Sequence, residues 1–362
     1  MNLRTLSLLS LLLALPVSAR ACDLCAIYNV IETQPLGGKG WTVGIAEQFT
    51  HFSTLQLDGR EVANSARQRL DSSVTQAALG YSITDRFGLQ LNVPFIHRDF
   101  RRPEEGRGMR NGETAGVGDL SLITNFLALR HESEKTTFTW TLTGGVKFPT
   151  GSTRRLREET AEGHHHGTAE VATEEEHPAG EEEHHAPART PAHAGVDHGA
   201  EEPPAEEAVE ELPTSGIHGH DLTLGSGSWD GIAGTSFFLR HRRLFLAAAL
   251  QYGIRSEGDY DYRFANDLMW SGGPGVYLAL QERYTGAVAL NCSGEHKGKD
   301  RFRGADSEDT GITAVYLGPE VRLTWKDRLS AEVGADFPVN IDNTALQIVP
   351  DYRLRASISI RF

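Results

Sequence analysis

The sequence predicts an antiparallel transmembrane β-barrel of about 12 strands, and three observations support this fold class. From Trp41 onward, apolar and polar residues alternate along most of the chain, which is the pattern of strands with two unlike faces. After the first 21 residues there is no apolar run long enough for a membrane-spanning helix, so a membrane could be crossed only by strands. Short and long connections alternate between the strands, as expected of turns on one side of a membrane and loops on the other.

The final segment, 352–362, shows the alternation most clearly. One face carries Tyr352, Leu354, Ala356, Ile358, Ile360 and Phe362, and the other carries Arg353, Arg355, Ser357, Ser359 and Arg361. Three arginines on one face cannot point into an apolar core unless each is paired. In a membrane barrel the apolar face contacts lipid and the polar face lines a wet lumen. A soluble sandwich or barrel is the alternative, and it would bury a polar face on most strands.

The same pattern places the other strands in chain order. We expect strands near 40–52, 72–84, 87–99, 118–130, 137–149, 228–240, 243–255, 266–281, 284–295, 310–325, 329–340 and 350–362. Two of them fit less well. Glu47 lies on the otherwise apolar side of the first strand, and residues 228–240 place large apolar side chains on both faces.

Charged residues point inward on the last three predicted strands. These lumen residues are Glu320, Arg322, Glu332, Asp336, Arg353, Arg355 and Arg361. Cross-strand pairs among them would line or partly block a pore. They therefore fit either a selective path for small polar or ionic solutes, or ion pairs that only stiffen a closed barrel.

The first 21 residues have the order of a secretory signal peptide: a charge at Arg4, an apolar run from Leu6 to Val17, and small residues around Ala21. We therefore divide the chain into a signal peptide (1–21), a periplasmic N-terminal segment (22–39) and an outer-membrane barrel (40–362) interrupted by a loop at 150–221. The predicted location is the outer membrane of a Gram-negative-type cell, with the loop extracellular. A lipoprotein acylated at Cys22 is an alternative, which Arg20 makes a poor fit.

The loop at 150–221 carries 18 Asp and Glu residues against four arginines, a difference equal to the chain's whole net charge of −14. It has almost no large apolar residue, so we expect it to be disordered. It holds ten of the 15 histidines: His164, His165, His166, His177, His184, His185, His193, His198, His218 and His220. Imidazole and carboxylate are ligands for Zn²⁺, Ni²⁺ and Cu²⁺, which makes these histidines candidate metal ligands. A solvated loop without specific function, pH sensing and adhesion are the alternatives.

The three cysteines have separate interpretations. Cys22 and Cys25 form a CxxC pair, but Ala26 stands where a c-type haem site needs histidine. A disulfide loop, thiolate capture of copper or zinc, and a redox-active pair remain open for them. Cys292 lies on the outward face of its strand and is expected to be an inert apolar residue.

Two parts of the chain resemble known outer-membrane proteins. The segment 352–362, ending on Phe362, resembles the terminal strand by which the barrel-assembly machinery recognises its substrates. Gly80–Pro94, Gly116–Leu122 and Lys147–Gly151 resemble stretches of the barrel family named after the meta pathway of phenol degradation. The resemblance covers roughly residues 40–150 and the final strands. It implies a transporter-like outer-membrane barrel and no catalytic residues, and the insertion after Gly151 departs from the family's pattern.

The leading functional hypothesis is an outer-membrane channel or transporter component. Its histidine loop would capture divalent metal at the surface, and its charged lumen would admit metal or small solutes. A closed structural or metal-buffering barrel and passage of hydrophobic or aromatic compounds are the alternatives. We expect no enzyme activity. His97 lies on the apolar side of its strand, where a catalytic histidine could be exposed, but the sequence offers no nucleophile that could act with it. The absence of clustered Lys and Arg argues against nucleic acid as a partner.

Overall fold

The computed structural model describes residues 39–104, 108–162 and 214–362. Within them, 12 long strands form the wall of a barrel. They are β1 (Gly40–Leu57), β3 (Arg69–Ser82), β4 (Phe87–Glu104), β6 (Ser121–Glu132), β7 (Thr136–Lys147), β8 (Asp230–His241), β9 (Leu244–Ile254), β11 (Asp267–Leu280), β12 (Tyr284–Lys297), β15 (Ile312–Trp325), β16 (Leu329–Asn343) and β17 (Leu346–Arg361). The predicted number of strands is therefore confirmed, and the predicted bounds agree to within a few residues at most strand ends.

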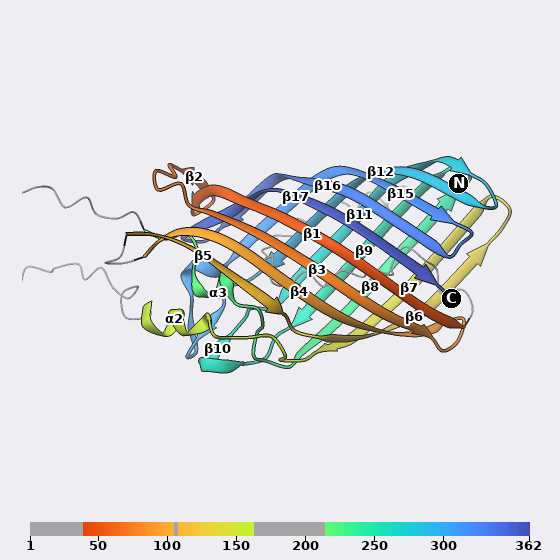
Figure 1. Ribbon diagram of the computed structural model, residues 1–362. Coiled ribbons are helices and arrows are strands. Elements are labelled where there is room, and N and C mark those ends of the chain that lie inside the picture. The colour runs from red at the N-terminus through yellow and green to blue at the C-terminus, as the bar shows by residue number, and fades with distance from the viewer. Residues whose placement is uncertain (1–38, 105–107, 163–213) are drawn as a thin grey trace, which may run out of the picture.

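Each long strand pairs antiparallel with the next long strand along the chain, and β17 pairs with β1 to close the wall. The closing register runs from Thr42 opposite Arg361 to Leu57 opposite Leu346. Figure 1 shows the strands crossing the barrel obliquely, with the C-terminus at the end where the connections are short. We call this the turn end, and we call the opposite end, which carries the long connections, the loop end.

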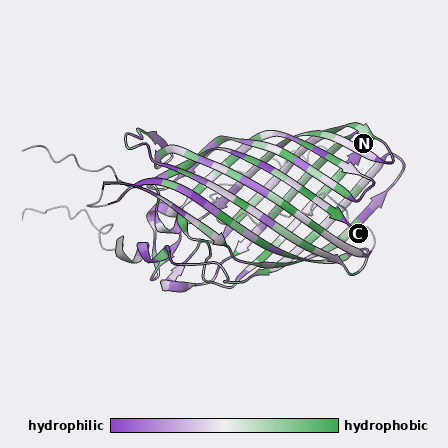
Figure 2. Cartoon of the chain, in the orientation of Figure 1, coloured by the Kyte–Doolittle hydropathy of each residue, from purple (hydrophilic) through white to green (hydrophobic). Residues whose placement is uncertain are grey.

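The wall has an apolar outer face and a polar inner face, as the alternation predicts. On β17, the outward Leu354 is 47% exposed, whereas the inward Arg353 is 6% exposed. The outward residues of the other strands follow the same rule, with Ile45, Leu142 and Val333 among them. Figure 2 shows hydrophobic residues recurring along the wall, while hydrophilic residues gather at the loop end and at the turns. The fold class is therefore a closed antiparallel transmembrane β-barrel.

The two segments that fitted the alternation poorly have different explanations. Glu47 does point outward, and its carboxylate accepts hydrogen bonds from the hydroxyls of Ser73 and Thr75 on β3. In β8, Phe238 points inward and packs against Phe245 of β9 with 5.8 Å between ring centroids. A small aromatic cluster inside the barrel thus accounts for the apolar residues on both faces of 228–240.

Shorter elements extend the loop end beyond the wall. They are β2 (Arg60–Val62), β5 (Gly108–Val117), β10 (Tyr262–Arg263), β13 (Arg301–Phe302), β14 (Ala305–Asp306), the helices α2 (Leu156–Glu162) and α3 (Gly219–Leu222), and the 3-10 turns η2 (Asp259–Asp261) and η3 (Glu308–Thr310). β5 pairs with the loop-end half of β4, and β10, β13 and β14 form a separate small sheet. No helix of the described residues is long and apolar enough to cross a membrane.

Residues 148–162 and 214–229, which we call the inserted segment, fold back onto the barrel at the loop end (Figure 1). Most residues from Gly216 to Ser228 are buried. The prediction of disorder for 150–221 is therefore wrong for residues 150–162 and 214–221. The middle of that loop, 163–213, lies outside the described residues, as do the predicted signal peptide and the segment 22–39.

Candidate functional site

A cluster of charged side chains lies on the inner wall across β15, β16 and β17, where the sequence predicts it. Arg355 is its centre, because its guanidinium lies 2.7 Å from Asp336, 3.4 Å from Glu320 and 3.5 Å from Glu332. Arg322 also pairs with Glu320, and it lies 3.4 Å from Glu332. We call these five residues the lumen charge cluster. Three carboxylates face two guanidinium groups, so its formal charge is −1.

Two further predicted lumen residues lie beside this cluster. Arg353 forms an ion pair with Glu295 of β12, and its guanidinium lies over the ring of Tyr316, 4.1 Å from the centroid. Arg361 pairs in register with the inward Thr42, which places it near the turn end. All seven predicted residues thus lie on the inner face of the wall. Glu295 is a lumen residue that the sequence interpretation missed, although its inward position follows from the alternation on β12.

A second set of buried charges lies near the loop end and spans five neighbouring strands. The sequence analysis did not predict it. Lys147 lies 2.9 Å from Asp119 and 2.8 Å from Asp230, and Arg255 lies 2.9 Å from Asp230 and 2.6 Å from Asp267. We call this chain the rim charge ladder. Its signal in the sequence is one charged residue at or just beyond the loop end of each of these consecutive strands.

The rim charge ladder also holds the inserted segment. Asp119 accepts hydrogen bonds from the backbone N–H of Ser226 at 2.8 Å and of Gly151 at 2.9 Å. Burial raises the pKa of Asp119, but the charge of Lys147 and these hydrogen bonds outweigh burial and leave the pKa below its ordinary value. The carboxylate is therefore ionised at neutral pH and ties both halves of the inserted segment to the wall.

Arginines of β4, the strand next to β6, also hold the inserted segment. Arg98, which is 1% exposed, donates to the backbone carbonyl of Thr223 at 2.6 Å. Arg102 donates to the carbonyl of Ile217 at 3.0 Å and pairs with Glu158 of α2. An unpaired buried charge is costly. The two carbonyls and the Glu158 carboxylate therefore stabilise the buried arginines, and the arginines in turn hold the segment.

Apolar packing completes the attachment. Ile217 and Leu222, both fully buried, join Phe52, Leu55, Leu70, Phe100 and Ile348 of the wall in one cluster. Leu224 packs with Val74 and Ile96, and Leu156 packs with Tyr262 and Phe264. The inserted segment therefore contacts several sides of the loop end, and it narrows the mouth of the lumen.

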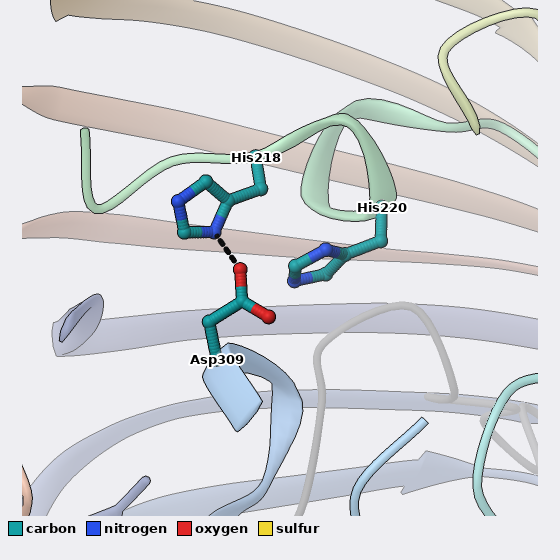
Figure 3. Close-up of side chains that lie close together, drawn as sticks. All are labelled: His218, His220 and Asp309. Carbon is teal, nitrogen blue, oxygen red and sulfur yellow. Dashed lines mark ion pairs between the residues drawn. The ribbon is translucent and has the colours of Figure 1, made fainter. Parts of the chain in front are cut away.

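Two of the ten predicted metal ligands, His218 and His220, lie in this inserted segment and are 7% and 2% exposed. Nδ1 of His218 lies 2.7 Å from Asp309 of η3, and Nδ1 of His220 lies 3.0 Å from Glu159 of α2. Figure 3 shows both rings turned toward the Asp309 carboxylate. The other eight histidines of the loop, with Cys22 and Cys25, lie outside the described residues.

Carboxylates control the ionisation of both rings. Burial lowers the pKa of His218, but the hydrogen bond and charge of Asp309 outweigh burial and raise it to about 9. Burial likewise lowers the pKa of His220, but the charges of Asp221 and Glu159 raise it well above its ordinary value. In a metal-free protein at neutral pH, two imidazolium groups therefore help to hold α3 against α2 and η3.

The outer wall near the loop end carries a polar strip of side chains that pair with one another. Nε2 of His97 lies 3.1 Å from Glu113, and Nδ1 of His51 lies 2.6 Å from Asp71. His97, for which the sequence offers no matching nucleophile, thus has a carboxylate of β5 as its neighbour. Cys292 is exposed on the outer face, the direction that the alternation predicts.

The fold is similar to that of an outer-membrane channel from Pseudomonas putida F1, with a TM-score of 0.56 and 14% sequence identity over 89% of this chain and 96% of that one. More distant similarity links it to two autotransporter domains. The transport unit of AIDA-I from Escherichia coli has a TM-score of 0.42 and 9% identity, covering 94% of both chains. The translocator domain of NalP from Neisseria meningitidis has a TM-score of 0.39 and 10% identity, covering 92% of both chains.

At such low identity the similarity is one of fold alone, and nothing further rests on the two autotransporter domains. No family model and no curated protein sequence matches the chain. The resemblance to the family named after phenol degradation therefore stays a prediction.

Proposed function

We propose that this protein is an outer-membrane channel that admits small polar or ionic solutes through the lumen of its barrel. The observation that carries the proposal is the charged inner wall. The lumen charge cluster and the Arg353–Glu295 pair lie on the inner face of strands whose outer face is apolar. Charged groups on that face are stabilised by water and by one another, which a wet lumen provides.

The opposite side of the lumen supports the same proposal, because it carries small side chains. Thr141, Ser236, Ala249 and Ser271 lie side by side in register across β7, β8, β9 and β11. Side chains of this size leave space that large residues would fill in a barrel whose interior is packed. A solute path would therefore pass this row of small neutral side chains, between the rim charge ladder on its loop-end side and Phe238 and Phe245 on its turn-end side.

The proposed arrangement in the cell follows from the same architecture. We place the barrel in the outer membrane, with the segment 22–39 in the periplasm and the long connections outside, because barrels of this kind have short periplasmic turns. The C-terminal strand, which ends in Phe362, would be the segment by which the barrel-assembly machinery recognises the chain. Epitope tags in the 163–213 loop and in the 22–39 segment test this topology, and accessibility of the loop tag only after the cells are opened would contradict it.

The experiment that tests the channel is electrical recording from the full-length folded protein in a planar lipid bilayer. We expect discrete current steps whose size changes when residues of the lumen charge cluster are replaced. Refolded protein that inserts without any current step, and that releases no small solute from liposomes, would contradict a channel.

The inserted segment favours a second candidate, a closed barrel with a structural role. Its packing against several sides of the mouth would block passage if the segment never moved. Current through the unaltered protein separates the candidates, because a barrel that stays closed should show none. Passage of hydrophobic or aromatic compounds is a third candidate, which the charges of the inner wall disfavour.

Metal capture by the histidine loop is a further proposal that the described residues leave open. Zn²⁺, Ni²⁺ or Cu²⁺ would bind to the eight histidines between 163 and 213, of which His164, His165 and His166 are adjacent. Deleting residues 163–213 keeps both anchored ends of the inserted segment. Metal accumulation by cells that carry this variant should fall in metal-poor medium, and unchanged accumulation would contradict capture.

A further inference from the structure

Two histidines and an aspartate meet at the loop end in an arrangement unlike any other among the described residues. One ligand atom each from His218, His220 and Asp309 lies within 4.8 Å of the other two. The three side chains come from different parts of the chain, since His218 and His220 lie in and beside α3 and Asp309 lies in η3 (Figure 3). Small side-chain rotations would bring these atoms to the separations found around one bound ion.

The second nitrogen of each ring already has a partner. Nε2 of His218 lies 2.9 Å from the backbone carbonyl of Ser215, and Nδ1 of His220 lies 3.0 Å from the Glu159 carboxylate. Histidines that bind metals commonly donate their other N–H to a carbonyl or carboxylate, which fixes the orientation of the ring. This leaves Nδ1 of His218, which lies 2.7 Å from Asp309, and Nε2 of His220, which lies 3.4 Å from Asp221, as the ring atoms that could bind a metal.

The charges around the rings favour a cation. Asp309, Glu159 and Asp221 all lie within ion-pair distance of the two histidines. The neighbouring Glu158 is different, because Arg102 and Arg155 pair with it. Carboxylates that are largely buried need positive charge close by, and an ion between the rings would supply it.

We propose that His218, His220 and Asp309 bind one divalent transition-metal ion, for which Zn²⁺ is the best match. Two imidazole nitrogens and a carboxylate oxygen form a ligand set that suits zinc, whereas calcium and magnesium prefer sites built from oxygen alone. Asp221 is placed to complete a tetrahedral set, because its carboxylate lies 3.4 Å from Nε2 of His220. This site differs from the proposed capture by the histidine loop, because its ligands are held by folded structure.

The position of the site gives the ion a structural consequence. It joins the α3 part of the inserted segment directly to η3, the turn before β15, and through the second nitrogen of His220 to α2. Both halves of the inserted segment and the connection before β15 would thus be fixed to one another by a single ion. The proposal does not depend on whether the barrel conducts, because its test measures binding and local exchange.

The test uses the full-length folded protein in detergent, in a background where the eight histidines between 163 and 213 are replaced by asparagine. We compare this background with a variant that also carries His218→Asn and His220→Asn, using calorimetry with Zn²⁺ and the metal content after gel filtration. The background should bind one more zinc ion per chain than the variant, whose affinity should fall at least about 100-fold. Zinc should also slow hydrogen exchange in the α3 peptide of the background alone.

The matched control replaces His131 and His241, two exposed histidines at the turn end, and should leave zinc binding unchanged. If the double variant does not fold, as judged by its mobility on unboiled gels, Asp309→Asn takes its place and should weaken binding at least about tenfold. Equal zinc binding by the background and the site variants would overturn the proposal. So would a background protein whose α3 exchange does not respond to zinc.

Discussion

The most informative perturbation of the inserted segment is Ile217→Ala. Ile217 is fully buried among residues that belong to the barrel wall, including Phe52, Leu55 and Phe100. The wall is held by its own ladders of hydrogen bonds, so the lost packing should act mainly on detachment of the segment. Replacing a buried isoleucine by alanine costs about 2–5 kcal/mol. The equilibrium for detachment should therefore shift by roughly 30-fold to a few thousand-fold.

Hydrogen exchange measured by mass spectrometry reads this equilibrium directly. Amides that exchange only when the segment detaches should exchange faster in proportion to the shift. The backbone N–H of Gly216, which donates to Gln68, and that of Leu224, which donates to Ser152, lie on either side of the substitution. Peptides covering 214–229 should therefore accelerate, whereas peptides of β11 and β12, far from Ile217 in the wall, should not.

The control is Ile358→Ala, because Ile358 is an equally large side chain on the outer face of β17 and is 47% exposed. It should leave exchange in 214–229 unchanged. Two results would refute the reasoning. One is exchange in 214–229 that stays within a few-fold of the parent protein, and the other is equal acceleration throughout the wall.

Three further predictions address the lumen, the rim and the wall. Arg355→Ala removes the cation at the centre of the lumen charge cluster, so the reversal potential in a salt gradient should move toward cation selectivity. Asp119 has a lowered pKa, so its contribution to stability is present at neutral pH and declines as the pH falls below about 4, which should reduce protection of the Ser226 amide. Gly318→Ala would put a methyl group 1.6 Å from the carbonyl oxygen of Ala335, so the folded fraction on unboiled gels should fall sharply.

Each of these predictions has its own control. Leu354→Ala, on the opposite face of β17, should not change ion selectivity, and an unchanged potential in Arg355→Ala would argue against conduction past the cluster. Asp119→Asn should abolish the acid dependence of Ser226 protection, corrected for intrinsic exchange, and a dependence that persists would assign it to another group. Gly144→Ala has open space around the new methyl group and should fold normally. Equal folding of the two glycine variants would show that the close approach at Gly318 is tolerated.

The fold could be predicted from the sequence because the two faces of each strand meet different surroundings. Residues such as Leu354 and Arg355 alternate in character, and this alternation gives the number of strands, the direction of each side chain and the positions of the turns. Two exceptions to the pattern have local explanations. Glu47 points outward because hydroxyls of β3 satisfy it, and Phe238 points inward because Phe245 packs against it.

The partners of the inward charges were harder to predict, because they depend on register across the barrel. Arg353 pairs with Glu295, which lies 58 residues away in the chain and three strands away in the wall. The inserted segment was missed for a different reason. Average composition over 150–221 indicates disorder, but Leu156 and Ile217, near its two ends, are apolar residues that the barrel buries. A search for isolated large apolar residues at the ends of the loop would have found this signal.

Closure of the barrel through β1 and β17 also has a consequence for biogenesis. Every other junction of the wall joins strands that are neighbours in the order of synthesis, whereas this seam joins positions such as Thr42 and Arg361. Bringing such distant positions together carries a larger entropic cost than forming a hairpin. Two unsatisfied edges must therefore persist until the last strand arrives, and a nascent chain that stops short of it would remain open to pairing with other polypeptides.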